Sequence, residues 1–155
     1  MRIKYLFILL TLFSSSLYAE TVLKVFANER IKLPESCSFI VRGGSENDFS
    51  CPSSTDPFRS ITFPVLESFE ESIPKRKDAN SLAEEEGLDF YSEPVRQLVI
   101  DDKKHYLWVW HMHGKSHQSY TVCDYRSCVK VSAMEIDFVR TIMEQFSSIT
   151  IYDIE

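Results

Sequence analysis

The chain has 155 residues, a formal net charge of −6 and a pI near 5.3, with 44% hydrophobic residues. An acidic chain repels nucleic acid and anionic membrane surfaces, so this composition argues against both as partners. The length suits one domain with a hydrophobic core of its own.

The N-terminal segment predicts export. Arg2 and Lys4 give a basic start, the run from Tyr5 to Leu12 is almost wholly apolar, and Ala19 offers a small residue at a cleavage point. No stretch reaches the roughly 18 apolar residues that a membrane span needs. We therefore expect a signal peptide over residues 1–19 and a single exported domain over 20–155, periplasmic in a bacterium. Cleavage leaves 15 basic and 23 acidic residues, a net charge of −8.

The first part of the exported chain alternates in the manner of short β-strands. The predicted strands are Thr21–Phe26, Arg30–Leu33, Cys37–Val41, Phe49–Cys51 and Arg59–Phe63. Pro64 is predicted to end the fifth strand, since proline donates no ladder hydrogen bond. The paired glycines Gly43 and Gly44 predict a hairpin loop between the third and fourth strands.

The segment from Glu67 to Glu93 is strongly acidic. It has nine acidic and three basic residues and thus carries −6 of the net charge of −8. Ser81-Leu-Ala-Glu84 has the form of a capping box, and a short helix through Glu86, ended by Gly87, is predicted. This segment is either a solvated linker or helix, or an acidic recognition surface with Glu84, Glu85 and Glu86 as its candidate contacts.

The stretch from residue 95 to residue 146 has the strongest structural signals. Strands are predicted over Val95–Ile100, Tyr106–His113, Ser119–Cys123 and Cys128–Val131, with a polar turn at residues 101–104 and a further short strand at residues 149–151. Ser132 and Glu135 form a second capping box, which predicts a helix from Ser132 to about residue 147. Its apolar stripe, Ile136, Val139, Met143 and Phe146, is predicted to cover the sheet. The expected fold is therefore α+β, a mostly antiparallel sheet covered by a C-terminal helix.

All four cysteines lie in the exported part, where an oxidising compartment favours disulfides. Four cysteines allow three pairings. We predict Cys37–Cys51 and Cys123–Cys128, because each pair flanks its own hairpin. A zinc site is the alternative, but neither pair has the close spacing that zinc ligands usually show.

The sequence lacks a recognisable catalytic constellation. No Gly-x-Ser-x-Gly elbow or glycine-rich phosphate loop is present, and no pair of carboxylates stands out by its spacing. His111 and His113 are predicted on one face of a strand, where they could share copper or zinc, or could be ordinary exposed histidines. We expect a protein that is not an enzyme and that has no metal or other cofactor.

The hairpin between Cys123 and Cys128 offers a second candidate contact. If the disulfide forms, it holds Tyr125 and Arg126 at a rigid tip, and these two residue types are favoured at binding hot spots. The alternative is an ordinary exposed turn.

The signal segment from Met1 to Ala19, the pair Cys37/Cys51, and the Cys123–Cys128 hairpin followed by a helix together resemble periplasmic immunity proteins. Bacteria carry these proteins against secreted, type VI-like antibacterial effectors. The resemblance implies a protein that binds its toxin and blocks the active site of that toxin, with no reaction of its own. The acidic charge of the chain predicts that this partner is basic. Two other classes stay open: a periplasmic metal-binding protein centred on His111 and His113, and a structural or sensor domain of the envelope.

Overall fold

The computed structural model describes residues 21–25, 30–40, 47–65 and 79–146. The predicted signal peptide, the glycine loop at Gly43-Gly44 and the predicted strand at residues 149–151 lie outside these residues. Within them the fold is a mostly antiparallel β-sheet with two short helices, as predicted.

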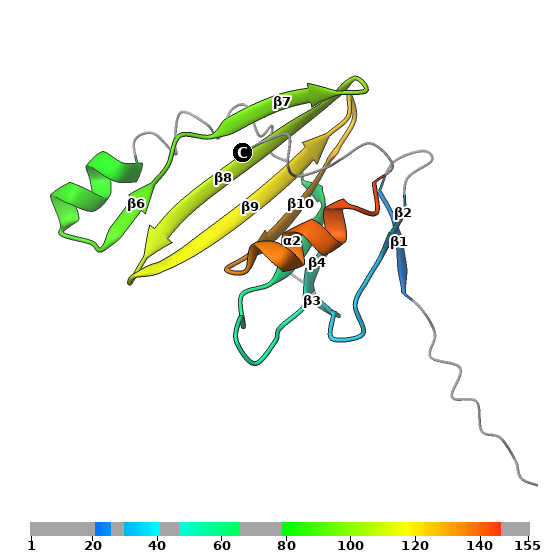
Figure 1. Ribbon diagram of the computed structural model, residues 1–155, viewed down its shortest axis with the longest axis horizontal. Helices are drawn as coiled ribbons and strands as arrows, with labels where there is room; N and C mark the ends of the chain where they lie inside the picture. The colour runs from blue at the N-terminus through cyan, green and yellow to red at the C-terminus, as the bar shows by residue number, and fades with distance from the viewer. Residues whose placement is uncertain (1–20, 26–29, 41–46, 66–78, 147–155) are drawn as a thin grey trace, which may run out of the picture.

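The main sheet has eight strands, and every strand pair in the described residues is antiparallel. Its spatial order is β3 (Ser38–Ile40), β4 (Asn47–Ser50), β5 (Ser60–Val65), β10 (Cys128–Ala133), β9 (Lys115–Cys123), β8 (Lys103–Met112) and β6 (Phe90–Ser92). β7 (Arg96–Ile100) also pairs with β8, on the same edge as β6 but along residues 103–107. The long β8–β9 hairpin forms the centre of the molecule (Figure 1).

The hydrophobic core lies on one face of this sheet, which we call the helix face. Helix α2 (Ile136–Met143) packs there and buries Phe138, Val139, Ile142 and Met143, together with Phe146 just beyond its end. These side chains meet the valines of β9 and β10, and Val25, Ile31 and Leu33 from the N-terminal hairpin join the same core. That hairpin consists of β1 (Val22–Lys24) and β2 (Arg30–Lys32) and forms a separate two-stranded sheet beside α2 (Figure 1).

The C-terminal helix covers the sheet as predicted, but it begins later than predicted. Ser132 lies in β10, where its hydroxyl donates to Ser119 Oγ at 3.0 Å, and Glu135 precedes the helix without a side-chain cap of its own. The Glu135 amide, which Ser132 should accept in a capping box, donates instead to Asp56, about 80 positions earlier, as does the Met134 amide. The capping-box prediction at Ser132 is therefore wrong.

β5 continues through Pro64 instead of ending before it. Between β10 and β5 the register shifts, so that Cys128 is opposite Val65 while Lys130 is opposite Thr62. An additional β5 residue is thereby accommodated beside Pro64. Proline is tolerated at such bulges because the ladder hydrogen bond is already missing there.

Both predicted disulfides form, Cys37–Cys51 and Cys123–Cys128. Each joins residues that face each other across a hairpin, since Ser38 pairs with Ser50 and Cys128 pairs with Cys123. Two disulfides are typical of an oxidising compartment outside the cytoplasm. No helix within the described residues is long and apolar enough to cross a membrane.

Candidate binding surface

The acidic segment forms an ordered end of the sheet and is not a linker over its described part. Residues 79–86 are helical, and the next residues continue into β6, a strand that the sequence did not predict. Ser81 lies within this helix, so the capping-box prediction for Ser81 and Glu84 is wrong. Gly87 has φ +66° and ends the helix as predicted, with the Gly87 amide donating to Glu84 and the Leu88 amide donating to Ala83.

Asn80 attaches this helix to the sheet. Its side-chain nitrogen donates to the Ser92 carbonyl at 2.8 Å, and its side-chain oxygen accepts from the Ser92 amide at 2.6 Å. Ser92 also accepts from Trp108 Nε1 at 2.6 Å. The helix, β6 and β8 are thus joined by side-chain hydrogen bonds, and the buried Ala83 packs below the exposed turns of the helix.

Five acidic side chains lie in this part of the chain, and residues 79–93 contain no lysine or arginine. They are Glu84, Glu85, Glu86, Asp89 and Glu93. The first four are exposed, and Glu93 is half-buried. We call this region, the helix over residues 79–86 with β6 and the β8–β9 turn, the acidic end. In Figure 1 it lies at the left, far from α2.

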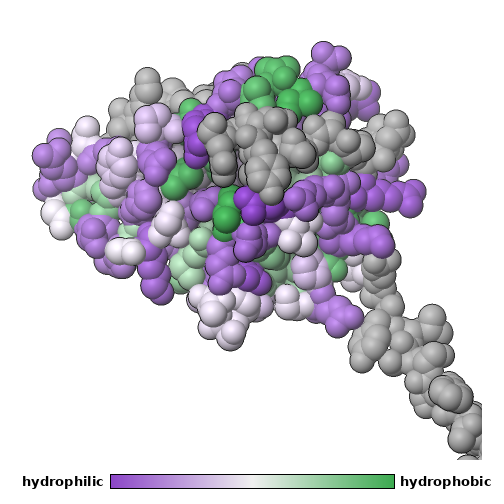
Figure 2. Space-filling view, in the orientation of Figure 1, coloured by the Kyte–Doolittle hydropathy of each residue, from purple (hydrophilic) through white to green (hydrophobic). Residues whose placement is uncertain are grey.

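Apolar side chains are exposed among these carboxylates. Of the nine large apolar residues that are exposed in the described part of the chain, four belong to the acidic end: Leu82, Leu88, Tyr91 and Met112. Figure 2 shows this end as mainly hydrophilic, interrupted by residues of intermediate (white) and hydrophobic (green) character. Tyr91 pairs with His111 and Met112 pairs with Phe90, so the side chains of Tyr91 and Met112 point to opposite faces of the sheet. Exposed apolar side chains beside charged ones are common at protein-binding sites.

The two histidines of the proposed metal site belong to this end but do not share a strand face. β8 ends at Met112, and His113 with Gly114 forms the two-residue hairpin turn, with φ values of +52° and +68°. His111 Nε2 lies 2.9 Å from Glu93 Oε1, and His113 Nδ1 lies 3.9 Å from Asp89 Oδ2. No group of three potential metal ligands occurs among the described residues. The prediction that His111 and His113 lie on one strand face is wrong, because the chain reverses direction at His113.

The Tyr125-Arg126 tip forms as predicted but lies at the opposite end of β9. Asp124 Oδ1 accepts the amides of Arg126 and Ser127 at 2.7 and 2.8 Å, which fixes the turn. Tyr125 is 83% exposed, and the Arg126 guanidinium lies 4.7 Å from the centre of its ring. Ten residues of β8 separate the two ends, about 30 Å at the usual rise of a strand. The predicted contacts therefore form two separate surfaces.

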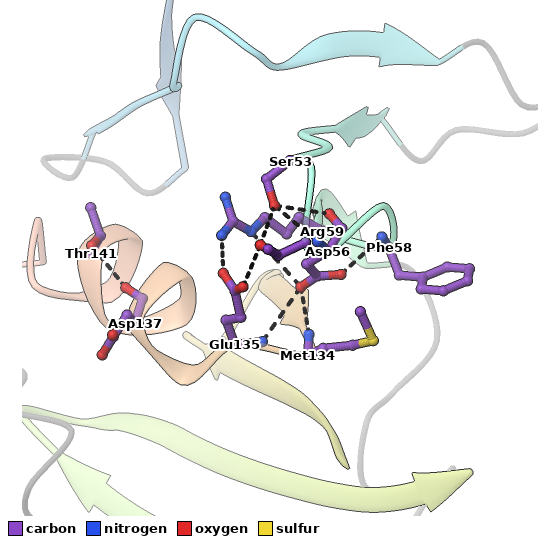
Figure 3. Close-up of polar contacts among 9 residues, drawn as sticks. Ser53, Asp56, Phe58, Arg59, Met134, Glu135, Asp137 and Thr141 are labelled. Atoms are coloured by element: carbon purple, nitrogen blue, oxygen red, sulfur yellow. Dashed lines mark hydrogen bonds and ion pairs between the residues drawn. The ribbon is translucent and has the colours of Figure 1, made fainter. Parts of the chain in front are cut away.

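A buried carboxylate that the sequence did not indicate joins the loop before β5 to the start of α2 (Figure 3). Asp56 is fully buried, and its carboxylate accepts the amides of Phe58 at 3.0 Å, Met134 at 2.7 Å and Glu135 at 3.4 Å. Arg59 pairs with Glu135 and also lies near Asp56. Hydrogen bonds from Thr55 and Arg59 lower the pKa of Glu135. Because the carboxylate oxygens of Asp56 already accept hydrogen bonds from backbone amides, we assign this side chain a structural role.

Comparison with known proteins finds no matching family model, no similar curated protein and no similar solved structure.

Proposed function

We propose that the protein is an exported inhibitor that binds a basic protein partner through its acidic end. The observation that carries the proposal is the ordered acidic end, which has five carboxylates, four exposed apolar side chains and no lysine or arginine in residues 79–93. The two disulfides support a location outside the cytoplasm. The class of partner that we propose is an antibacterial toxin acting in the cell envelope.

The two kinds of side chain have separate roles in this proposal. Exposed carboxylates attract a basic partner over several ångströms and raise the association rate, an effect that salt screens. Apolar and aromatic side chains that become buried in the complex act as anchors and govern the dissociation rate. Leu88 and Tyr91 are 56% and 54% exposed, so both have surface left to bury.

The first experiment captures the partner and measures its binding kinetics. The tagged mature protein is incubated with periplasm or culture fluid, and the bound proteins are identified by mass spectrometry. The double variant Glu85→Lys/Glu86→Lys should lower the association rate and weaken its salt dependence. Glu35→Lys/Glu144→Lys is the matched control, because it changes the net charge equally at exposed positions outside the acidic end. Equal effects of the two variants would contradict a localised acidic site.

A second comparison tests the anchors. Leu88→Asp should raise the dissociation rate, whereas Val22→Asp, a substitution at another exposed apolar residue, should not. Tyr125→Ala provides the comparison with the other predicted surface. A large rise in dissociation with Tyr125→Ala, together with no effect of Leu88→Asp, would move the binding site to the Tyr125-Arg126 tip.

The toxin part of the proposal is tested in cells. A strain that lacks this protein should be killed when the gene for the captured partner is expressed with an export signal, and the wild-type protein should restore growth. Glu85→Lys/Glu86→Lys should restore growth less well than Glu35→Lys/Glu144→Lys. Survival of the deletion strain with every captured partner would contradict the inhibitor function and favour the envelope structural or sensor class.

A further inference from the structure

A row of serines crosses the sheet on the face opposite α2, which we call the hydroxyl face. Residues paired directly across neighbouring strands point to the same face of a sheet. The pairings of β3, β4, β5, β10 and β9 align Ser38, Ser50, Ser60, Ser132 and Ser119, in that order. At 4.7–4.9 Å between strands, the row from Ser38 to Ser132 is about 14 Å long.

A second polar row runs beside the first. The pairings align Asp48, Thr62, Lys130 and Thr121, in that order, on β4, β5, β10 and β9, which are four of the five strands of the first row. Thr62 Oγ1 donates to Asp48 Oδ1 at 2.6 Å. Lys130 is half-buried. Ser119 and Thr121 are buried, whereas Ser50, Ser60 and Ser132 are half-buried, together with the cationic Lys130 and the anionic Asp48.

The middle of these rows, on β4, β5 and β10, lines a cavity of about 320 Å³. Its polar lining comes from Asp48, Ser50, Arg59, Ser60, Thr62, Lys130 and Ser132, and the loop before β5 adds Pro57 and Phe58. The contacts of Asp56 hold this loop in place, because the Phe58 amide donates to Asp56 while the Phe58 ring points away from the cluster (Figure 3). The cavity thus has a polar floor and a fixed aromatic wall.

Aromatic rings continue from this wall across the hydroxyl face. Phe58 is 61% exposed and meets the ring of His117 edge-on at 6.0 Å. His117 stacks on Trp110 at 5.4 Å, and Trp110 stacks on Trp108 at 4.2 Å. Burial lowers the pKa of His117, so this ring is neutral in neutral solution and adds no charge to the site.

We propose that this cavity, with the serine row on its floor, binds a neutral oligosaccharide. A hydroxyl can both donate and accept a hydrogen bond, so a row of serines matches the hydroxyls of a sugar without requiring a charge on the ligand. Lys130 and Asp48 carry opposite charges, and Arg59, the third charged lining residue, pairs with Glu135, which together disfavour a strongly charged ligand. The exposed ring of Phe58 offers a flat apolar surface to the C–H groups of a sugar ring. The spacing between strands is comparable with the length of one pyranose unit, so successive sugars can meet successive serines.

The test is an NMR titration of the ¹⁵N-labelled mature protein with three neutral trisaccharides: N,N′,N″-triacetylchitotriose, cellotriose and maltotriose. At least one should give saturable shifts at Ser50, Ser60, Thr62 and Lys130, with a dissociation constant below about 10 mM. Ser60→Val, which fills the floor and removes a hydroxyl, should weaken this binding at least about tenfold. Phe58→Ala, at the exposed wall, should also weaken the binding at least about tenfold. This variant replaces Ser60→Val as the test if the Ser60 variant does not fold.

The lysine has a matched control. Lys130→Met should weaken binding, whereas Lys115→Met, at an exposed lysine on the β8–β9 hairpin, should leave it unchanged. The absence of saturable shifts with all three sugars, or shifts confined to residues outside the cavity, would overturn the proposal. Equal binding of an uncharged Ser-Gly-Ser-Gly peptide would overturn the saccharide assignment and favour a peptide ligand.

Discussion

Substitution of Asp56 should destabilise the fold strongly, although this residue lies in a loop. Its fully buried carboxylate accepts the amides of Phe58 at 3.0 Å and Met134 at 2.7 Å, with a weaker bond from Glu135 at 3.4 Å. Hydrogen bonds to a charged group contribute about 1.5–3 kcal/mol each, so two good bonds give about 3–5 kcal/mol for Asp56→Ala. Asp56→Asn keeps one acceptor oxygen and should cost about half as much.

Urea denaturation followed by circular dichroism measures this effect. The urea concentration at the midpoint of unfolding should fall. The slope of the free energy of unfolding against urea concentration should stay the same, because the surface exposed on unfolding is unchanged. Asp137→Ala is the control: this carboxylate is 86% exposed and pairs with Arg140 at 3.0 Å, so its removal should cost less than about 0.5 kcal/mol. A loss below about 1 kcal/mol for Asp56→Ala would refute the reasoning, since the amides would then be satisfied without the carboxylate.

Three further predictions concern stability. Phe146 is 3% exposed, so Phe146→Ala should cost about 3–5 kcal/mol in the same assay; a loss below about 1 kcal/mol would place the ring outside the core. Burial and the nearby Lys103 lower the pKa of His105 to about 4. The free energy of unfolding should therefore be independent of His105 titration above about pH 6.5 and should fall by about 3 kcal/mol between pH 6.5 and 4, because the unfolded chain takes up the proton first. The variant His105→Gln should therefore show a flatter pH dependence of unfolding in that range, and an unchanged slope would contradict the assignment. Removing Cys37–Cys51, which are 14 residues apart, should cost about 3 kcal/mol, whereas removing Cys123–Cys128, 5 residues apart, should cost about 2 kcal/mol. Thermal unfolding of the two double serine variants tests this order.

Two predictions about the candidate sites were correct because they depended only on residues close together in sequence. Gly87 ends the acidic helix since a glycine readily adopts the positive φ that this position requires. The Tyr125-Arg126 tip followed from a four-residue spacing between two cysteines. The placement of His113 failed because an isolated histidine before Gly114 was assigned to the strand, although histidine tolerates positive φ better than most residues and glycine marks turns.

The sequence by itself determined the class of fold, the two disulfides and the apolar face of α2. Each rests on residues no more than 14 positions apart, so strand alternation, helical spacing and hairpin closure were enough to predict them. Tertiary structure decided where α2 begins, because the amides of Met134 and Glu135, just before the helix, bond to Asp56 while Ser132 stays in β10. It also decided the serine row, whose members range from residue 38 to residue 132 and align only through the register of five strands. A one-residue shift in any pairing would turn those hydroxyls to the other face, and register is set by packing over the whole sheet.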